Sequence, residues 1–158
     1  MKHLLLALLL LGALAHPLAA QSPIFLVRHA EKADVSKDPD LSPAGRARAE
    51  ALAVTLKSAG IRQIFVTEFK RTQQTAKPMA KAGGIEVKAI PANDLPVLVS
   101  LLQKAEHPVL VVGHSNTVPE IIKALGISGQ ITLKDSDYDN LFVVTPRAKR
   151  ELIRLHYR

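Results

Sequence analysis

Two histidines each follow a short run of apolar residues, and this repeated pattern is the part of the sequence that most clearly suggests chemistry. Residues 24–27 lead directly into Arg28 and His29, and residues 109–112 lead through one glycine into His114. Short apolar runs of this kind are typical of buried strands. Because ligands bind outside the carboxyl ends of the strands in open α/β sheets, we expect both histidines at one ligand-binding edge.

A second arginine, Arg71, begins a predicted helix directly after another strand and is expected at the same edge. Singly, each of Arg28, His29, Arg71 and His114 has an ordinary structural explanation, such as a surface arginine or a hydrogen-bonded core histidine. Together they indicate a dianion site, because a guanidinium group matches phosphate oxygens and stays charged. A helix N-terminus predicted after His114 adds free N–H groups, and a neutral imidazole is a competent nucleophile for phosphoryl transfer.

Two rival uses of the histidines fit the spacing less well. No HxxxH pair and no carboxylate-rich ligand set accompanies them, and the neighbouring arginines would repel a cation. Ser115 follows a predicted strand, but its surroundings do not match the GxSxG nucleophile turn of serine hydrolases. We therefore expect no metal, no other cofactor and no serine nucleophile.

Strands and helices alternate along most of the chain. Strands are predicted at residues 24–27, 61–67, 85–90, 109–112, 141–145 and 151–157, the last two as a hairpin at a sheet edge. Helices are predicted to start after an N-cap at Ser42, at Arg71, after a cap at Asn93 or Asp94, and at a capping box over residues 117–120. The alternation predicts an α/β, single-domain, three-layer fold with a largely parallel central sheet and helices on both faces.

Length and charge narrow the possible functions. A chain of 158 residues, 47% of them hydrophobic, suits one domain with its own core. The formal net charge of +7 raises nucleic-acid binding as a hypothesis, but aromatic residues make up only 4% and no nucleic-acid motif is present. We therefore predict no nucleic-acid partner and favour an anionic small molecule, which a basic protein attracts electrostatically.

The N-terminal residues 1–20 have the pattern of a secretory signal peptide. A basic start precedes an apolar run at residues 4–15, and small residues follow at residues 19–20. The run is too short to span a bilayer, which takes ~20 residues, so we expect no stable membrane anchor. There is no cysteine for lipid attachment. These features predict removal of residues 1–20, a domain at residues 21–158, and a periplasmic or secreted location.

Four sequence blocks carry a resemblance to a known family. In order along the chain, the blocks are Leu26-Val27-Arg28-His29-Ala30-Glu31, Leu41-Ser42-Pro43-Ala44-Gly45-Arg46, Thr67 with Arg71-Thr72-Gln73-Gln74-Thr75-Ala76, and Val112-Gly113-His114-Ser115-Asn116-Thr117. The chain resembles the histidine phosphatase superfamily, which includes phosphoglycerate mutases, small phosphohistidine phosphatases and acid phosphatases.

The resemblance implies a phosphoglycerate mutase-like fold and a role for each matching residue. It implies that His29 is the phosphorylated nucleophile. It implies that Arg28, Arg71 and His114 complete the phosphate pocket, with Thr67 and Asn116 as further substrate-binding residues.

Two positions depart from the family pattern. Ala30 stands where many members have glycine, which is tolerated unless the backbone needs a positive φ. The His-Asp pair of the acid phosphatase branch is absent, because Ser115 follows His114. The general acid is therefore open, with Asp94 and Glu31 as candidates, although Asp94 also fits a helix N-cap and Glu31 a surface carboxylate.

The function expected from this pattern is an exported, metal-independent phosphatase that hydrolyses small phosphomonoesters through a covalent phosphohistidine. Three alternatives remain open at this point. They are a phosphate-binding protein without activity, a phosphohistidine phosphatase, and a phosphotransferase of the mutase type.

Overall fold

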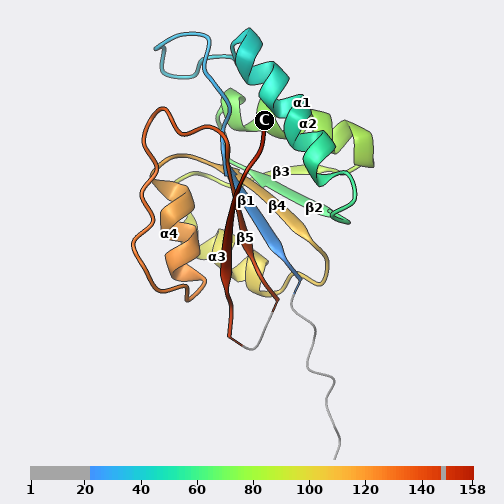
Figure 1. Cartoon of the computed structure of the whole chain (residues 1–158), viewed down its shortest axis with the longest axis vertical. Coiled ribbons are helices and arrows are strands. Elements are labelled where there is room, and N and C mark those ends of the chain that lie inside the picture. Colours follow the sequence, from blue (N-terminus) through green and yellow to red (C-terminus); the bar gives the residue numbers. More distant parts are fainter. Residues whose placement is uncertain (1–21, 147–148) are drawn as a thin grey trace, which may run out of the picture.

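Six strands form one sheet at the centre of the computed structural model, which describes residues 22–146 and 149–158 (Figure 1). The order across the sheet is β3-β2-β4-β1-β5-β6. The strands are β1 (Ile24–Arg28), β2 (Gln63–Val66), β3 (Val87–Ala89), β4 (Val109–Gly113), β5 (Asn140–Val144) and β6 (Leu152–His156). The predicted signal peptide at residues 1–20 lies outside the described residues and stays a prediction.

Strand directions agree with the prediction of a largely parallel sheet. β1 pairs in parallel with β4, β4 with β2, and β2 with β3. β5 runs antiparallel to β1 and forms an antiparallel hairpin with β6 at one edge, as the sequence predicts. At the other edge, β3 is shorter than the predicted strand at residues 85–90 and is largely exposed.

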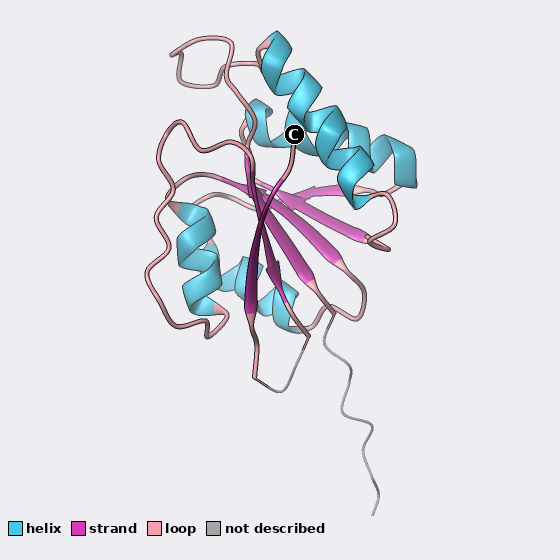
Figure 2. Ribbon diagram, viewed as in Figure 1, coloured by secondary structure: helices cyan, strands magenta, loops and turns pink. Residues whose placement is uncertain are grey.

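Helices cover both faces of the sheet, which confirms the three-layer α/β fold (Figure 2). α1 (Pro43–Leu56) and α2 (Lys70–Gly83) pack on one face through a core that includes Leu52 and Met79. α3 (Leu95–Gln103) and α4 (Thr117–Ala124) pack on the other face through a core that includes Leu102 and Ile122. None of the helices in the described part of the chain is long and apolar enough to cross a membrane.

The helices can be compared with the caps and interruptions that the sequence suggests. The Ser42 side chain accepts a hydrogen bond from the Gly45 N–H, so the predicted N-cap of α1 is confirmed. α2 continues through Pro78 without interruption. The predicted capping box at residues 117–120 is wrong, because Thr117 is the first residue of α4 and its hydroxyl accepts the His114 N–H at 2.9 Å.

Candidate active site

The ends of β1 and β4 bring the two histidines together, as predicted. Arg28 lies opposite Gly113 in the parallel register, and the His29 N–H donates to the Gly113 carbonyl at 2.9 Å. The imidazole rings of His29 and His114 meet edge to face with their centroids 5.3 Å apart. The two residues are only 4% and 8% exposed. Two neighbouring parallel strands therefore deliver both imidazoles to one point at their carboxyl ends.

Residues of the other sequence blocks hold this arrangement through the backbone. The Ala30 N–H donates to the Thr75 hydroxyl of α2 at 2.9 Å, and the Ser42 N–H before α1 donates to the Glu31 carbonyl at 2.9 Å. A Cβ at Gly45 would collide with that same carbonyl, so this close approach requires glycine. Ala30 is buried, and no non-glycine residue in the described ranges has a positive φ, so alanine is compatible with the backbone there.

His29 is held as a neutral imidazole with a defined tautomer. Its Nδ1 lies 2.8 Å from the Ala30 carbonyl oxygen, which can only accept, so Nδ1 carries the proton and Nε2 the lone pair. Burial lowers the pKa of His29 to about 3, the Ala30 hydrogen bond opposes this, and the positive charges of Arg28 and Arg71 lower it further. Above pH ~4 the ring is therefore available as a nucleophile without losing a proton first.

His114 is the first member of a buried chain of hydrogen bonds. Its Nδ1 lies 3.5 Å from Nη2 of Arg71, which can only donate, so the proton lies on Nε2 and points to the Thr67 hydroxyl at 3.0 Å. The Thr67 hydroxyl is 2.9 Å from that of Thr72, which donates to the Phe69 carbonyl at 2.8 Å. Burial and then the charge of Arg71 lower the pKa of His114 to about 4. The chain fixes the ring, and it places the predicted residue Thr67 beside His114.

Arg28 is held by a loop more than 100 residues further along the chain. Its Nη1 donates to the Lys134 carbonyl at 2.9 Å, its Nη2 lies 3.3 Å from Asp135 Oδ1, and its guanidinium lies 4.3 Å from the centre of the Tyr138 ring. Its Nε is buried and has no hydrogen-bond partner among the described residues. A buried donor without an acceptor is costly, and a phosphoryl oxygen would supply one.

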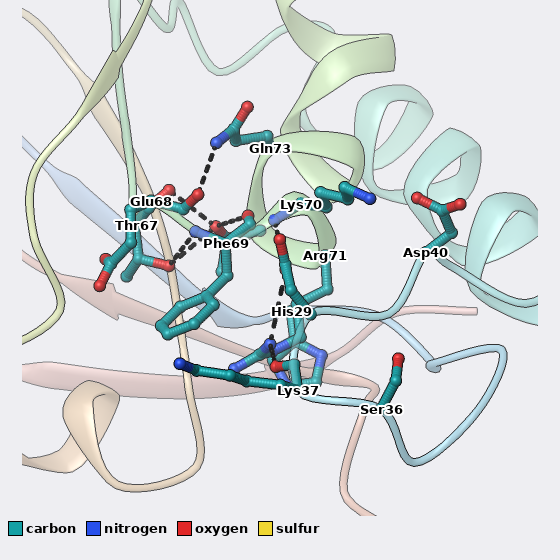
Figure 3. Close-up of polar contacts among 12 residues, drawn as sticks. His29, Ser36, Lys37, Asp40, Thr67, Glu68, Phe69, Lys70, Arg71 and Gln73 are labelled. Carbon is teal, nitrogen blue, oxygen red and sulfur yellow. Dashed lines mark hydrogen bonds and ion pairs between the residues drawn. The ribbon is translucent and has the colours of Figure 1, made fainter.

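Arg71 extends from the first turn of α2 towards the loop that follows β1 (Figure 3). Its Nη1 lies 3.3 Å from the Lys37 carbonyl and 3.9 Å from Asp38 Oδ1, and its guanidinium stacks at 4.3 Å on the Phe69 ring. Its Nε is likewise buried without a partner in the described part of the chain. Two arginines thus each retain a buried donor beside the histidine pair.

Three predicted site residues lie apart from this cluster. The Glu31 carboxylate is bound by the Arg48 guanidinium at 2.7–2.9 Å. Asp94 caps α3, accepting the Val97 N–H at 3.4 Å, which confirms its reading as an N-cap. Asn116 is exposed at the start of α4. Within the described ranges, no hydrogen bond or ion pair joins Glu31, Asp94 or Asn116 to the arginines or histidines of the site.

Sequence reasoning missed three residues at the site. Asp135 and Tyr138 contact Arg28, and the charge of Glu68 raises the pKa of His114 against the larger effects of burial and Arg71. A carboxylate next to the second arginine block was a usable signal for Glu68. No local pattern marks the loop of Asp135. Across residues 22–146 and 149–158, no group of three or more histidine and acidic side chains could hold a metal ion.

The lowered histidine pKa values predict a pH dependence of stability. In the unfolded chain, both histidines bind a proton as the pH falls below their ordinary pKa of 6.5. In the folded protein, the pKa is about 3 for His29 and about 4 for His114, so neither binds a proton until the pH is much lower. The free energy of unfolding should therefore fall as the pH falls, by about 2 kcal/mol per histidine between pH 7.5 and 5. Urea unfolding at both pH values measures this. His29→Ala should remove its share of the pH dependence, and an equal dependence in His29→Ala would contradict the argument. The exposed His107→Ala is the matched control.

Comparisons with known proteins agree with this geometry. Residues 24–92 match the model of the histidine phosphatase superfamily (branch 1). The chain is 36% identical over 75 residues to a protein named "Probable phosphoglycerate mutase GpmB" from Yersinia enterocolitica, a match covering 43% of this chain. It spans about a third (35%) of the length of that curated relative.

Solved structures of low sequence identity share the fold. The protein histidine phosphatase SixA, solved with tungstate, superposes with a TM-score of 0.66 at 19% identity, covering 85% of this chain and 96% of that one. A mycobacterial glucosyl-3-phosphoglycerate phosphatase superposes with a TM-score of 0.64 at 13% identity, covering 85% and 98%. These likenesses confirm the phosphoglycerate mutase-like fold.

Proposed function

We propose that the chain is a member of the histidine phosphatase superfamily, whose model its residues 24–92 match, and that it is a phosphatase that acts through a phosphohistidine on His29. One observation carries the proposal. A buried histidine keeps an unprotonated Nε2 beside a second histidine and two arginines that each retain a buried free donor. Such a site both supplies a nucleophile and neutralises the charge of a transferring phosphoryl group.

The proposed first step moves the phosphoryl group from substrate to His29. Nε2 attacks phosphorus, the N–P bond forms, and the bond from phosphorus to the leaving oxygen breaks. Nδ1 keeps its proton, and its hydrogen bond to the Ala30 carbonyl stabilises the positive charge that the ring gains. Arg28 and Arg71 stabilise the negative charge on the phosphoryl oxygens, and His114 holds the Arg71 guanidinium in place through its Nδ1. In the second step water attacks phosphorus, the N–P bond breaks, and neutral His29 returns.

We further propose that the substrates are small phosphomonoesters and that the chain is exported. The net charge of +7 favours anionic substrates, and the apolar segment with its basic start at residues 1–20 has the pattern of a signal peptide. N-terminal sequencing of the protein from fractionated cells tests export. A chain that begins near residue 21 outside the cytoplasm is expected, and an intact N-terminus in the cytoplasm would contradict it.

Phosphate release tests the proposed activity. The protein should release phosphate from a panel of aryl phosphates, sugar phosphates and phosphoramidates, and a chelator should leave the rates unchanged because the proposed chemistry uses only side chains. Release that a chelator abolishes would contradict the mechanism. Saturable phosphate binding with no release from any compound would instead favour a binding protein. The order of rates within the panel identifies the substrate class.

A further inference from the structure

Asp135 places a carboxylate at the outer edge of the site. Its Oδ1 lies 3.3 Å from Nη2 of Arg28 and 3.3 Å from the hydroxyl of Ser115, the residue that follows His114. The Asp135 side chain is 92% exposed, whereas that of Arg28 is 5% exposed. Asp135 therefore touches the phosphate-binding arginine from the solvent side.

The loop that carries Asp135 is built into the fold. The Lys134 N–H donates to Asp137 Oδ2 at 2.9 Å, and the Asp137 N–H donates back to the Lys134 carbonyl at 3.0 Å. Leu133 anchors the loop in the core, and the Tyr138 ring lies 6.1 Å from the His29 ring. Anchors on both sides of Asp135 thus hold it near the nucleophile.

The chemistry needs a proton donor at this outer edge. A phosphoryl group bound at the buried histidines directs its leaving group to solvent, and a poor leaving group needs a proton as its bond to phosphorus breaks. Among the described residues, the carboxylates of Asp38 and Asp135 contact the arginines, and the charge of Glu68 raises the pKa of His114. Asp38 accepts the Lys70 N–H at 2.9 Å and Glu68 accepts the Ala92 N–H at 2.8 Å. Both of these carboxylates are therefore already held by a backbone N–H of a neighbouring segment.

Asp135 differs from the other two carboxylates in its partners. Among the described residues, it accepts no hydrogen bond from a backbone N–H, only from the Ser115 hydroxyl and Arg28. A dianionic phosphoryl group at the same arginine adds a negative charge beside the carboxylate, which favours its protonated form. Substrate binding would therefore favour protonation of the Asp135 carboxylate, and this is the proton that the leaving group needs.

We infer that Asp135 is the general acid of the reaction, an inference that rests on the proposed function. As Nε2 of His29 attacks phosphorus, the Asp135 carboxyl gives its proton to the leaving oxygen, which departs as a neutral alcohol. Asp135 is then a carboxylate. In the second step it takes a proton from the attacking water, whose oxygen bonds to phosphorus as the N–P bond breaks, and both residues return to their starting states.

The test compares leaving groups in the full chain carrying Asp135→Asn. With glycerol 3-phosphate, whose alkoxide leaves poorly, kcat should fall by about 10²–10⁴-fold. With 4-nitrophenyl phosphate, which needs little proton transfer, kcat should fall by less than about 10-fold. Glu68→Gln removes the same charge near His114 and should leave the ratio of the two rates unchanged. Asp135→Glu, which keeps a carboxyl group, should recover part of the glycerol phosphate rate.

The outcomes separate the inference from the proposed function. Equal losses on both substrates in Asp135→Asn would overturn the inference, since Asp135 would then only position Arg28. A selective loss in Glu68→Gln would overturn it in favour of Glu68. Activity retained by His29→Ala in the same assay would instead overturn the proposed function. Binding of inorganic phosphate shows that Asp135→Asn is folded, and Asp135→Ser provides the same comparison if it is not.

Discussion

His29→Ala is expected to abolish phosphate release from every substrate, lowering kcat by about 10⁴–10⁶-fold. Alanine removes Nε2, whose lone pair forms the bond to phosphorus in the proposed mechanism, and no other described side chain has both its position and its tautomer. The loss should be the same for good and poor leaving groups, because the nucleophile acts before either can depart. Steady-state release from 4-nitrophenyl phosphate measures the effect.

The control for this variant is His107→Ala. His107 is exposed and precedes β4, at the opposite end of the strand from His114. It removes the same side chain without touching the site, and its rate should match that of the unmodified protein. His29→Ala should still bind inorganic phosphate through the two arginines, which separates lost chemistry from lost folding. Substantial turnover by a folded His29→Ala protein would disprove the mechanism.

Arg71→Ala is expected to lower kcat/KM by about 10³-fold. The variant removes one of the two guanidinium groups that would neutralise the phosphoryl oxygens in the proposed mechanism. It also removes the donor to His114 Nδ1 that sets the tautomer of that ring. Arg71→Lys should recover only part of the loss, because an ammonium group is a point charge and cannot reproduce the planar fork. Arg62→Ala, an exposed arginine before β2, is the matched control.

A second measurement separates the structural and electrostatic parts of that effect. The charge of Arg71 is, after burial, the largest cause that lowers the pKa of His114 to about 4. Arg71→Ala should therefore raise the pKa of His114 towards 6.5, and an NMR titration of the ring follows it directly. A pKa that stays near 4 would show that burial alone sets it, and that Arg71 acts only on the substrate.

Local patterns were sufficient to predict the fold and the meeting of the two histidines at one edge of the sheet. Apolar runs identified the strands, and the rule that ligands gather at the carboxyl ends of parallel strands predicts from the sequence alone that His29 and His114 lie together. Ser42 and Asp94 were predictable as N-caps, because a short polar side chain before a helical pattern has one common use there. These inferences depend on residues that are near one another in sequence.

The unpredicted features depend on contacts between distant segments. Arg28 and Asp135 are separated by 107 positions, and nothing in a polar turn marks it as the one that folds over the site. Glu31 is bound by Arg48 because α1 returns over the segment after β1. Thr117 fits a capping box by spacing, yet its hydroxyl is already engaged by the His114 N–H. In each case, tertiary packing determines which of several possible partners a polar side chain binds.

Trapping the intermediate tests the central claim most directly. The protein is mixed with 4-nitrophenyl phosphate, quenched in alkali, where a phosphohistidine survives, digested, and examined by mass spectrometry. The account predicts one added phosphoryl group on the peptide that contains His29, formed as fast as turnover and absent from His29→Ala. Turnover without that modification, or a phosphoryl group on another residue such as His114, would contradict it.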